Sequence, residues 1–115
     1  MGILTSGTTA TGFTTAADAT YNATTGAVSI PAGIDTIDTN AFLNQTDIKS
    51  VVLPISLVTI GQSAFAGCSN LTSVSFAAGS PALQSIGLYA FYLCSSLTSI
   101  SLPASLRTVA QVGLL

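Results

Sequence analysis

A stretch of 23 residues recurs along most of this chain, and this repetition constrains the fold more than any other feature. Residues 51–73, VVLPISLVTIGQSAFAGCSNLTS, align with residues 28–50 before them and with residues 74–99 after them. The later copy is longer by three residues near Gly79, and a partial fourth copy covers residues 100–115. A period of about 20 to 30 residues with fixed apolar positions is typical of a solenoid, in which each coil buries the apolar face of its neighbour. The sequence therefore predicts a solenoid of about 3.5 coils.

Equivalent apolar residues of successive copies predict columns of stacked side chains inside this solenoid. From the first copy to the last, three such columns are Phe42, Phe65 and Phe91; Ile37, Ile60, Ile86 and Val109; and Ile48, Leu71 and Leu97. Apolar residues also alternate with polar ones in short segments, at Val51/Leu53, Val74/Phe76 and Ile100/Leu102. This period of two predicts strands with one face inside, which would pair in parallel between coils at about 4.8 Å.

Two motifs of the repeat resemble a known family. The pattern L-x-x-V-x-F at residues 71–76, like L-x-x-I-x-L at residues 97–102, is a leucine-rich-repeat strand pattern. Together with I-G-x-x-A-F-x-x-C-S-x-L-T-S at residues 60–73 and 86–99, it closely resembles the BspA-type leucine-rich repeats over about residues 27–110. The resemblance implies a mainly β solenoid, with a parallel strand ladder and a short helical turn around each Ala-Phe pair. It also implies a bacterial or protozoan surface protein that binds host or matrix proteins.

The sequence predicts a short N-terminal region before the repeats. Residues 1–20 are dominated by Thr, Ala and Gly, which favours an extended arm or a flexible leader. Residues 21–115 are expected to form the solenoid. A hairpin over residues 21–30, which turns at Thr24-Thr25-Gly26 and leaves Tyr21 exposed, is expected to cap its first coil.

The other end of the chain predicts an interface. The last seven residues include only one strongly polar side chain, so the final coil is expected to expose its apolar core. Either the natural chain is longer, or this end packs on another subunit. Contacts between unlike ends do not close and can build filaments. The candidate assembly residues are Val109, Val112, Leu114 and Leu115.

The composition excludes several classes of partner. Charged residues make up 5% of the chain, against about 25% in typical proteins, and only two residues are basic. Nucleic-acid binding depends on clustered Lys and Arg, so it is not expected. Ser, Thr, Gly and Pro interrupt every apolar run before it reaches about 18 residues, so no transmembrane helix is expected.

The amino end lacks a secretory signal. The extracellular or cell-surface location that the resemblance implies then requires that a signal was removed, or a route without one, as for a virion component.

No residue constellation indicates a reaction. The chain has no His, so neither a serine nor a cysteine triad can be assembled. Cys68 and Cys94 occupy equivalent repeat positions, and we favour two buried thiols over a disulfide or a zinc site. Asp35, Asp38 and Asp47 are interpreted as solvated turn residues rather than a calcium or catalytic pair. We expect no catalytic residue, metal site or cofactor, and no enzyme activity.

The best candidate binding face is the outward side of the predicted strands. Its residues are Lys49, Ser50, Val52, Thr72, Ser73, Ser75, Thr98, Ser99 and Ser101. Solenoids present such faces to partners, although a solvated hydroxyl face would look the same in the sequence. Two functions remain open: a noncatalytic protein–protein interaction or adhesion module, and a structural subunit that assembles through its uncapped ends into a filament, shell or virion surface.

Overall fold

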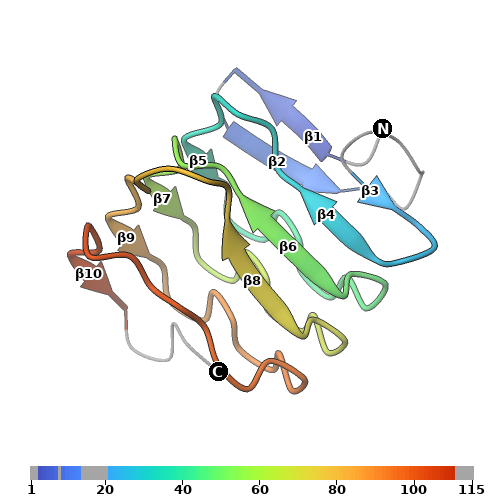
Figure 1. Ribbon diagram of the computed structural model, residues 1–115. Coiled ribbons are helices and arrows are strands. Elements are labelled where there is room, and N and C mark those ends of the chain that lie inside the picture. The colour runs from blue at the N-terminus through green and yellow to red at the C-terminus, as the bar shows by residue number, and fades with distance from the viewer. Residues whose placement is uncertain (1–2, 8, 14–20, 111–115) are drawn as a thin grey trace.

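A computed structural model describes residues 3–7, 9–13 and 21–110 of the chain. These residues contain ten strands and no helix (Figure 1). The strands are β1 (Ile3–Ser6), β2 (Thr9–Phe13), β3 (Tyr21–Asn22), β4 (Ala27–Ser29), β5 (Thr36–Ile37), β6 (Ser50–Leu53), β7 (Thr59–Ile60), β8 (Ser73–Phe76), β9 (Ser85–Ile86) and β10 (Thr108–Val109).

The strands form two sheets; each of the first three copies of the repeat adds a strand to both, and the fourth copy adds β10 to the first sheet only. The first sheet has the order β1-β2-β5-β7-β9-β10 and the second has the order β3-β4-β6-β8. Only β1–β2 and β3–β4 pair antiparallel, whereas every strand pair between coils is parallel. Equivalent residues face each other, as in Val51↔Val74 and Ile60↔Ile86. The predicted repeat solenoid with a parallel strand ladder is therefore confirmed.

The aromatic column lies in the centre of the core. The rings of Phe42 and Phe65 stack with centroids 4.9 Å apart, and those of Phe65 and Phe91 stack at 5.3 Å, within 3° of parallel. All three side chains are fully buried, and each ring covers the face of the next. The column that begins with Ile37 is also buried, but its last member, Val109, is 41% exposed. Val109 lies on β10, at the outer edge of the first sheet, where no described strand covers it.

The third side of each coil is a ribbon of turns, which we call the turn ribbon. It covers residues 38–45, 61–68 and 87–94. In the second coil, the Ala66 N–H donates to the Ser63 carbonyl within the coil at 3.2 Å, whereas the Phe65 N–H donates to the Ala90 carbonyl of the next coil at 2.8 Å. An α-helix would satisfy both groups within its own coil. The short helical turns that the resemblance implied are therefore wrong for the described residues.

Every fourth residue of the turn ribbon has a positive φ angle, which lets the chain alternate between local and inter-coil bonds. The first position is held by Asn40, Ser63 and Tyr89, and the second by Asn44, Gly67 and Leu93. The five non-glycine residues have φ between 56° and 61°. Asn and Gly tolerate this left-handed region, whereas Tyr and Leu rarely enter it.

Two hairpins precede the first full coil. Residues 3–6 and 9–13, for which the sequence left an extended arm or a flexible leader open, form β1 and β2, and β2 pairs in parallel with β5. The second hairpin, β3–β4, turns at Gly26, whose φ is 70°. A Cβ atom at Gly26 would lie 2.8 Å from the Asp47 carbonyl oxygen, so this position requires glycine. The expectation that Tyr21 is exposed is wrong: it is 3% exposed, because β3 places it against the core.

The fourth coil is attached to the third on one side only. The N–H groups of Arg107, Thr108 and Ala110 donate to carbonyl groups of the third coil at 2.9 to 3.0 Å. On the other side, residues 98–105 make no backbone hydrogen bond to β8, and the strand expected at Ile100/Leu102 is absent. The connection between β8 and β9 contains the three extra residues, so the third coil is longer here than the fourth and the two do not superimpose.

Candidate functional site

Six of the nine predicted binding residues lie together on the second sheet. The strand register places Ser50 beside Ser73 and Val52 beside Ser75. All six are exposed or half-buried. We call this surface the outer face; it consists of Lys49, Ser50, Val52, Thr72, Ser73 and Ser75. The Thr72 hydroxyl also has a structural contact, because its Oγ1 donates to the Lys49 carbonyl at 2.9 Å.

The other three predicted residues do not continue the outer face as strand neighbours. Thr98, Ser99 and Ser101 are exposed, but they lie where the third copy passes into the fourth, and no ladder bonds to β8 hold them in register. The structure thus brings together two rows of the predicted surface rather than three.

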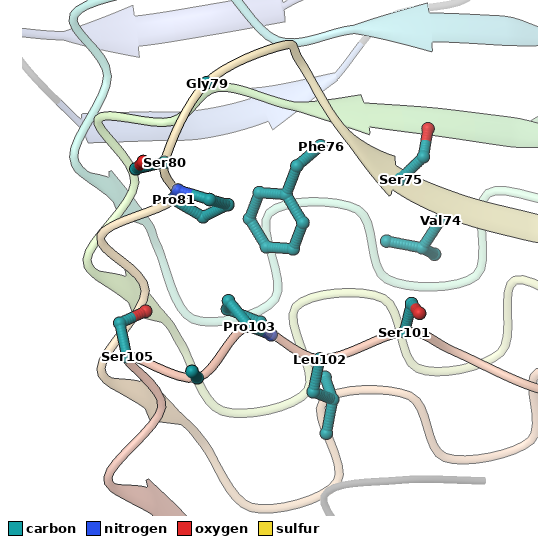
Figure 2. A pocket seen from close by; sticks show the side chains of 11 residues that line it. Val74, Ser75, Phe76, Gly79, Ser80, Pro81, Ser101, Leu102, Pro103 and Ser105 are labelled. Atoms are coloured by element: carbon teal, nitrogen blue, oxygen red, sulfur yellow. The ribbon is translucent and has the colours of Figure 1, made fainter.

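A groove of about 560 Å³ separates β8 from the fourth coil. Figure 2 shows the Phe76 ring between the two walls, with Leu102 and Pro103 on the opposite segment. Its lining residues are uncharged: Val74, Ser75, Phe76, Gly79, Ser80, Pro81, Ser101, Leu102, Pro103, Ala104 and Ser105. Sequence reasoning missed the groove, although the three-residue insertion near Gly79 was the signal that marks it.

Three large side chains project from the turn ribbon of the third coil. We call Tyr89, Tyr92 and Leu93 the tyrosine patch. Leu93 is 62% exposed, and the tyrosine rings lie 5.1 Å apart at an angle of 55°. Sequence reasoning also missed this patch. The available signal was a difference between copies. Where the third copy has Tyr89 and Leu93, the other two copies have small or polar residues.

One of the two edge strands of the first sheet contains a residue of the predicted assembly end. β1 is at one edge and β10 at the other. Of the four candidate assembly residues, Val109 lies on β10 and is exposed, whereas Val112, Leu114 and Leu115 lie outside the described residues.

The two cysteines are free and buried, as the repeat position predicted. The Cys68 Sγ donates to the Phe42 carbonyl at 3.1 Å and the Cys94 Sγ to the Phe65 carbonyl at 3.0 Å. Desolvation, with a smaller electrostatic effect of Cys94, raises the pKa of Cys68 to about 12. Desolvation also raises the pKa of Cys94 to about 11. Both thiols therefore stay protonated at neutral pH, where the thiolate needed for nucleophilic chemistry is negligible.

Two acidic residues of the first copy accept hydrogen bonds within their own turns. The Asp35 carboxylate accepts a hydrogen bond from the Thr36 hydroxyl, and the Asp38 carboxylate accepts one from the Thr39 N–H, each at 2.9 Å. Within the part of the chain that the structure describes, no group of three or more His, Cys, Asp or Glu side chains lies together as a metal site would require. The same residues include no helix with the length and apolar character needed to cross a bilayer.

Family models and solved structures agree on what this chain is similar to. The model of the BspA type leucine rich repeat region matches residues 15–112 in six copies. No curated protein matches the chain. A leucine-rich repeat protein of T. pallidum has 34% sequence identity and a TM-score of 0.65, over 72% of this chain and 40% of that protein.

Two further solved structures share the fold. A leucine-rich repeat protein of Bacteroides capillosus has 24% identity and a TM-score of 0.76, over 96% of this chain and 89% of that one. A leucine rich cell surface protein of Faecalibacterium prausnitzii has 26% identity and a TM-score of 0.74, over 91% of this chain. This chain spans only 25% of the F. prausnitzii protein and 40% of the T. pallidum protein.

Proposed function

Because the chain belongs to the BspA-type leucine-rich repeat family, we propose that it is a noncatalytic module that binds another protein at a cell surface or outside the cell. The family supports a repeat-based interaction or surface module. One of the similar solved structures is described as a cell surface protein, which favours that location for this chain. The outer face is the proposed contact surface.

The observation that supports this proposal is the register of the exposed residues on β6 and β8. Ser50 lies beside Ser73 and Val52 beside Ser75, so these two short rows carry hydroxyl groups at three of their four positions, on a backbone that the ladder keeps rigid. Such rows offer hydrogen bonds at fixed spacing with little conformational entropy left to lose on binding. Lys49 is the only charged residue of the surface, so affinity there would depend little on salt.

The test places a carboxylate on the outer face and measures adhesion. Purified chain is passed over a panel of immobilised extracellular-matrix proteins, and any partner is then tested against Ser73→Asp and Val52→Asp. Both positions point outward, so far-ultraviolet circular dichroism should not change, while affinity should fall at least tenfold. Thr72 is a poorer choice, because its hydroxyl bonds the Lys49 carbonyl.

The matched control is Ala78→Asp, which adds the same charge at an exposed position of the third coil, outside the outer face. It should bind as the unmodified chain does. Equal affinity of all three variants for the partner would place the contact elsewhere, and failure of every panel protein to bind would contradict the adhesion role.

The exposed edge strand β10 supports a second candidate function, a structural subunit that assembles end to end. Val109 is 41% exposed on β10, and β1 offers the opposite edge of the same sheet. Exposed strand edges pair readily with other chains unless charge prevents it, and this chain has little charge. Light scattering and electron microscopy should then show polymers that Val109→Lys converts to monomers, while Ala78→Lys does not. A monomer at every concentration would contradict this function.

A further inference from the structure

We propose that the groove between β8 and residues 101–105 binds one extended, uncharged segment of a partner polypeptide, which adds to β8 as a further strand. This site lies beside the contact surface proposed above and shares one residue with it, Ser75. The proposal follows from the free backbone edge of β8, from the apolar and uncharged lining of the groove, and from the bonds that hold its far wall.

The free edge of β8 has the geometry that already binds a strand elsewhere in the molecule. The Ala77 N–H donates to the Leu53 carbonyl at 2.9 Å, and Val74 pairs with Val51. In a parallel ladder the backbone groups of alternate residues point to opposite sides. The N–H and C=O groups of Val74 and Phe76 therefore face the groove.

Among the described residues, these backbone groups of β8 have no hydrogen-bond partner on the groove side. In the preceding coil the equivalent groups belong to Val51 and Leu53, and they hold β8 itself. The edge of β8 thus repeats a surface whose known occupant is an extended strand. Peptides that add to a sheet edge obtain their affinity from this kind of main-chain bonding.

The lining favours an occupant of a defined chemistry. Phe76 and Leu102 are partly buried and stand on opposite walls, as Figure 2 shows. None of the lining residues carries a charge. A charged side chain would lose part of its hydration there without gaining a partner, so the groove favours an uncharged segment with apolar side chains.

Hydrogen bonds on the far side hold the second wall away from β8. The Arg107 N–H donates to the Gln84 carbonyl at 2.9 Å, and the Ser105 hydroxyl donates to the Leu83 carbonyl at 2.7 Å. Pro103 contributes no N–H group to this wall and has a fixed φ. The chain itself therefore does not fill the groove in the described structure, and residues 101–105 are anchored at the end nearest β10.

The probe for this site is a synthetic peptide with the sequence of residues 71–77, LTSVSFA, with both ends blocked. This is the strand that the equivalent edge of β6 binds in the protein. Backbone amide exchange is followed by NMR on the full chain with and without peptide, up to about 1 mM. The amides of Val74 and Phe76 should exchange quickly in the free chain and at least tenfold more slowly with peptide, while the bonded amide of Ala77 should not change.

Two matched controls separate strand addition from general stickiness. Ser101→Asp adds a charge on the groove wall and should weaken peptide binding at least tenfold, whereas Ser99→Asp adds the same charge two residues away, outside the lining, and should change affinity less than twofold. A peptide methylated at alternate backbone nitrogens should not bind.

Three results would overturn the proposal: no binding of LTSVSFA, binding without protection of Val74 and Phe76, or protection of both amides in a chain that is already dimeric without peptide. The last result would show that a second copy occupies the groove. Val52→Asp and Ser73→Asp should bind the peptide normally, so this test can fail or succeed independently of the outer face.

Discussion

Leu93 and Tyr89 adopt backbone angles that side chains of their size rarely take. Their φ angles are 61° and 59°, in the left-handed region. For an ordinary L-residue this conformation costs about 1–2 kcal/mol. The ribbon position of Leu93 is occupied by Asn44 in the first copy and by Gly67 in the second, and both of these residue types tolerate a positive φ. The tyrosine patch is thus formed at a cost in stability, which is typical of residues kept for a contact rather than for folding.

Replacing Leu93 by Gly should stabilise the protein by about 0.5–1 kcal/mol, because relief of the backbone strain exceeds the added entropy of the unfolded chain. Little apolar contact is lost, since Leu93 is 62% exposed. Urea unfolding measures the change. The control is Asn44→Gly at the equivalent position, which should change stability by less than about 0.5 kcal/mol. An equal gain in both variants would refute the assignment of strain to the Leu side chain.

Alkaline pH should destabilise the fold through the two buried thiols. Their pKa values are raised from 9.0 to about 12 and about 11, so the unfolded chain loses these protons first. The stability that the protonated thiols contribute to the folded state is fully present below pH 9. It declines as the pH rises toward the pKa values of the folded state. Each thiol should contribute up to about 1.4 kcal/mol per pH unit in that interval.

The measurement is the free energy of unfolding at pH 8, 9 and 10, for the unmodified chain and for a variant with Cys68→Ala and Cys94→Ala. The two proteins differ only at the two cysteine positions, so the difference in slope isolates the thiols. Parallel slopes would mean that the thiols are not desolvated in the folded state.

At the scale of elements, the column of rings was predictable from the sequence and the shape of the turn ribbon was not. Phe42, Phe65 and Phe91 occupy the same position of three copies, and a solenoid must stack equivalent residues, so repetition alone fixes their contacts. A short helix and the turn ribbon bury the same residues. The two differ in φ at positions such as Asn40 and Ser63 and in their backbone hydrogen bonds, and the apolar pattern records neither.

The candidate site was likewise predictable only in part. Ser50 and Ser73 were correctly placed side by side because both lie within regular copies. Ser101 was placed in the same row, but its position depends on how the three-residue insertion alters the third coil, and no repeat pattern contains that information. The groove and the tyrosine patch result from differences between copies, whereas the predicted columns and rows depend on the similarity of the copies.

Truncation of the central ring tests the column. Phe65→Ala should cost about 3–5 kcal/mol, because it leaves a cavity between two fully buried rings. Tyr92→Ala, at a 41% exposed position, should cost clearly less. Equal losses in urea unfolding would contradict the stacked core.

A double-mutant cycle tests the contact between neighbouring rings. Milder changes from Phe to Leu should give a coupling of about 0.5–1.5 kcal/mol for Phe42 with Phe65. Phe42 and Phe91, which Phe65 separates, should give a coupling near zero.

At the scale of the whole molecule, stability should fall from the second coil to the fourth. In a solenoid each coil is stabilised only by its neighbours. The second coil has ladders on both sides, whereas the fourth has a ladder only at β9–β10, with the Ser105 hydroxyl bond and the partly buried Ile100, Leu102 and Leu106 as its further contacts. Native-state hydrogen exchange should therefore give the bonded amides of Arg107, Thr108 and Ala110 a lower free energy of opening than the bonded amides of Gly61 and Phe65. Uniform protection along the chain would show that the molecule unfolds as a single cooperative unit.

The register between the second coil and its neighbours has a consequence for how a gene of this kind can grow. Residues 51–73 meet the same backbone pattern before and after them, so an in-frame duplication of these 23 codons would insert a coil that fits both. The protein would lengthen by about 4.8 Å without any change to the existing coils. Recombination can thus change the length of such a protein in steps of one coil.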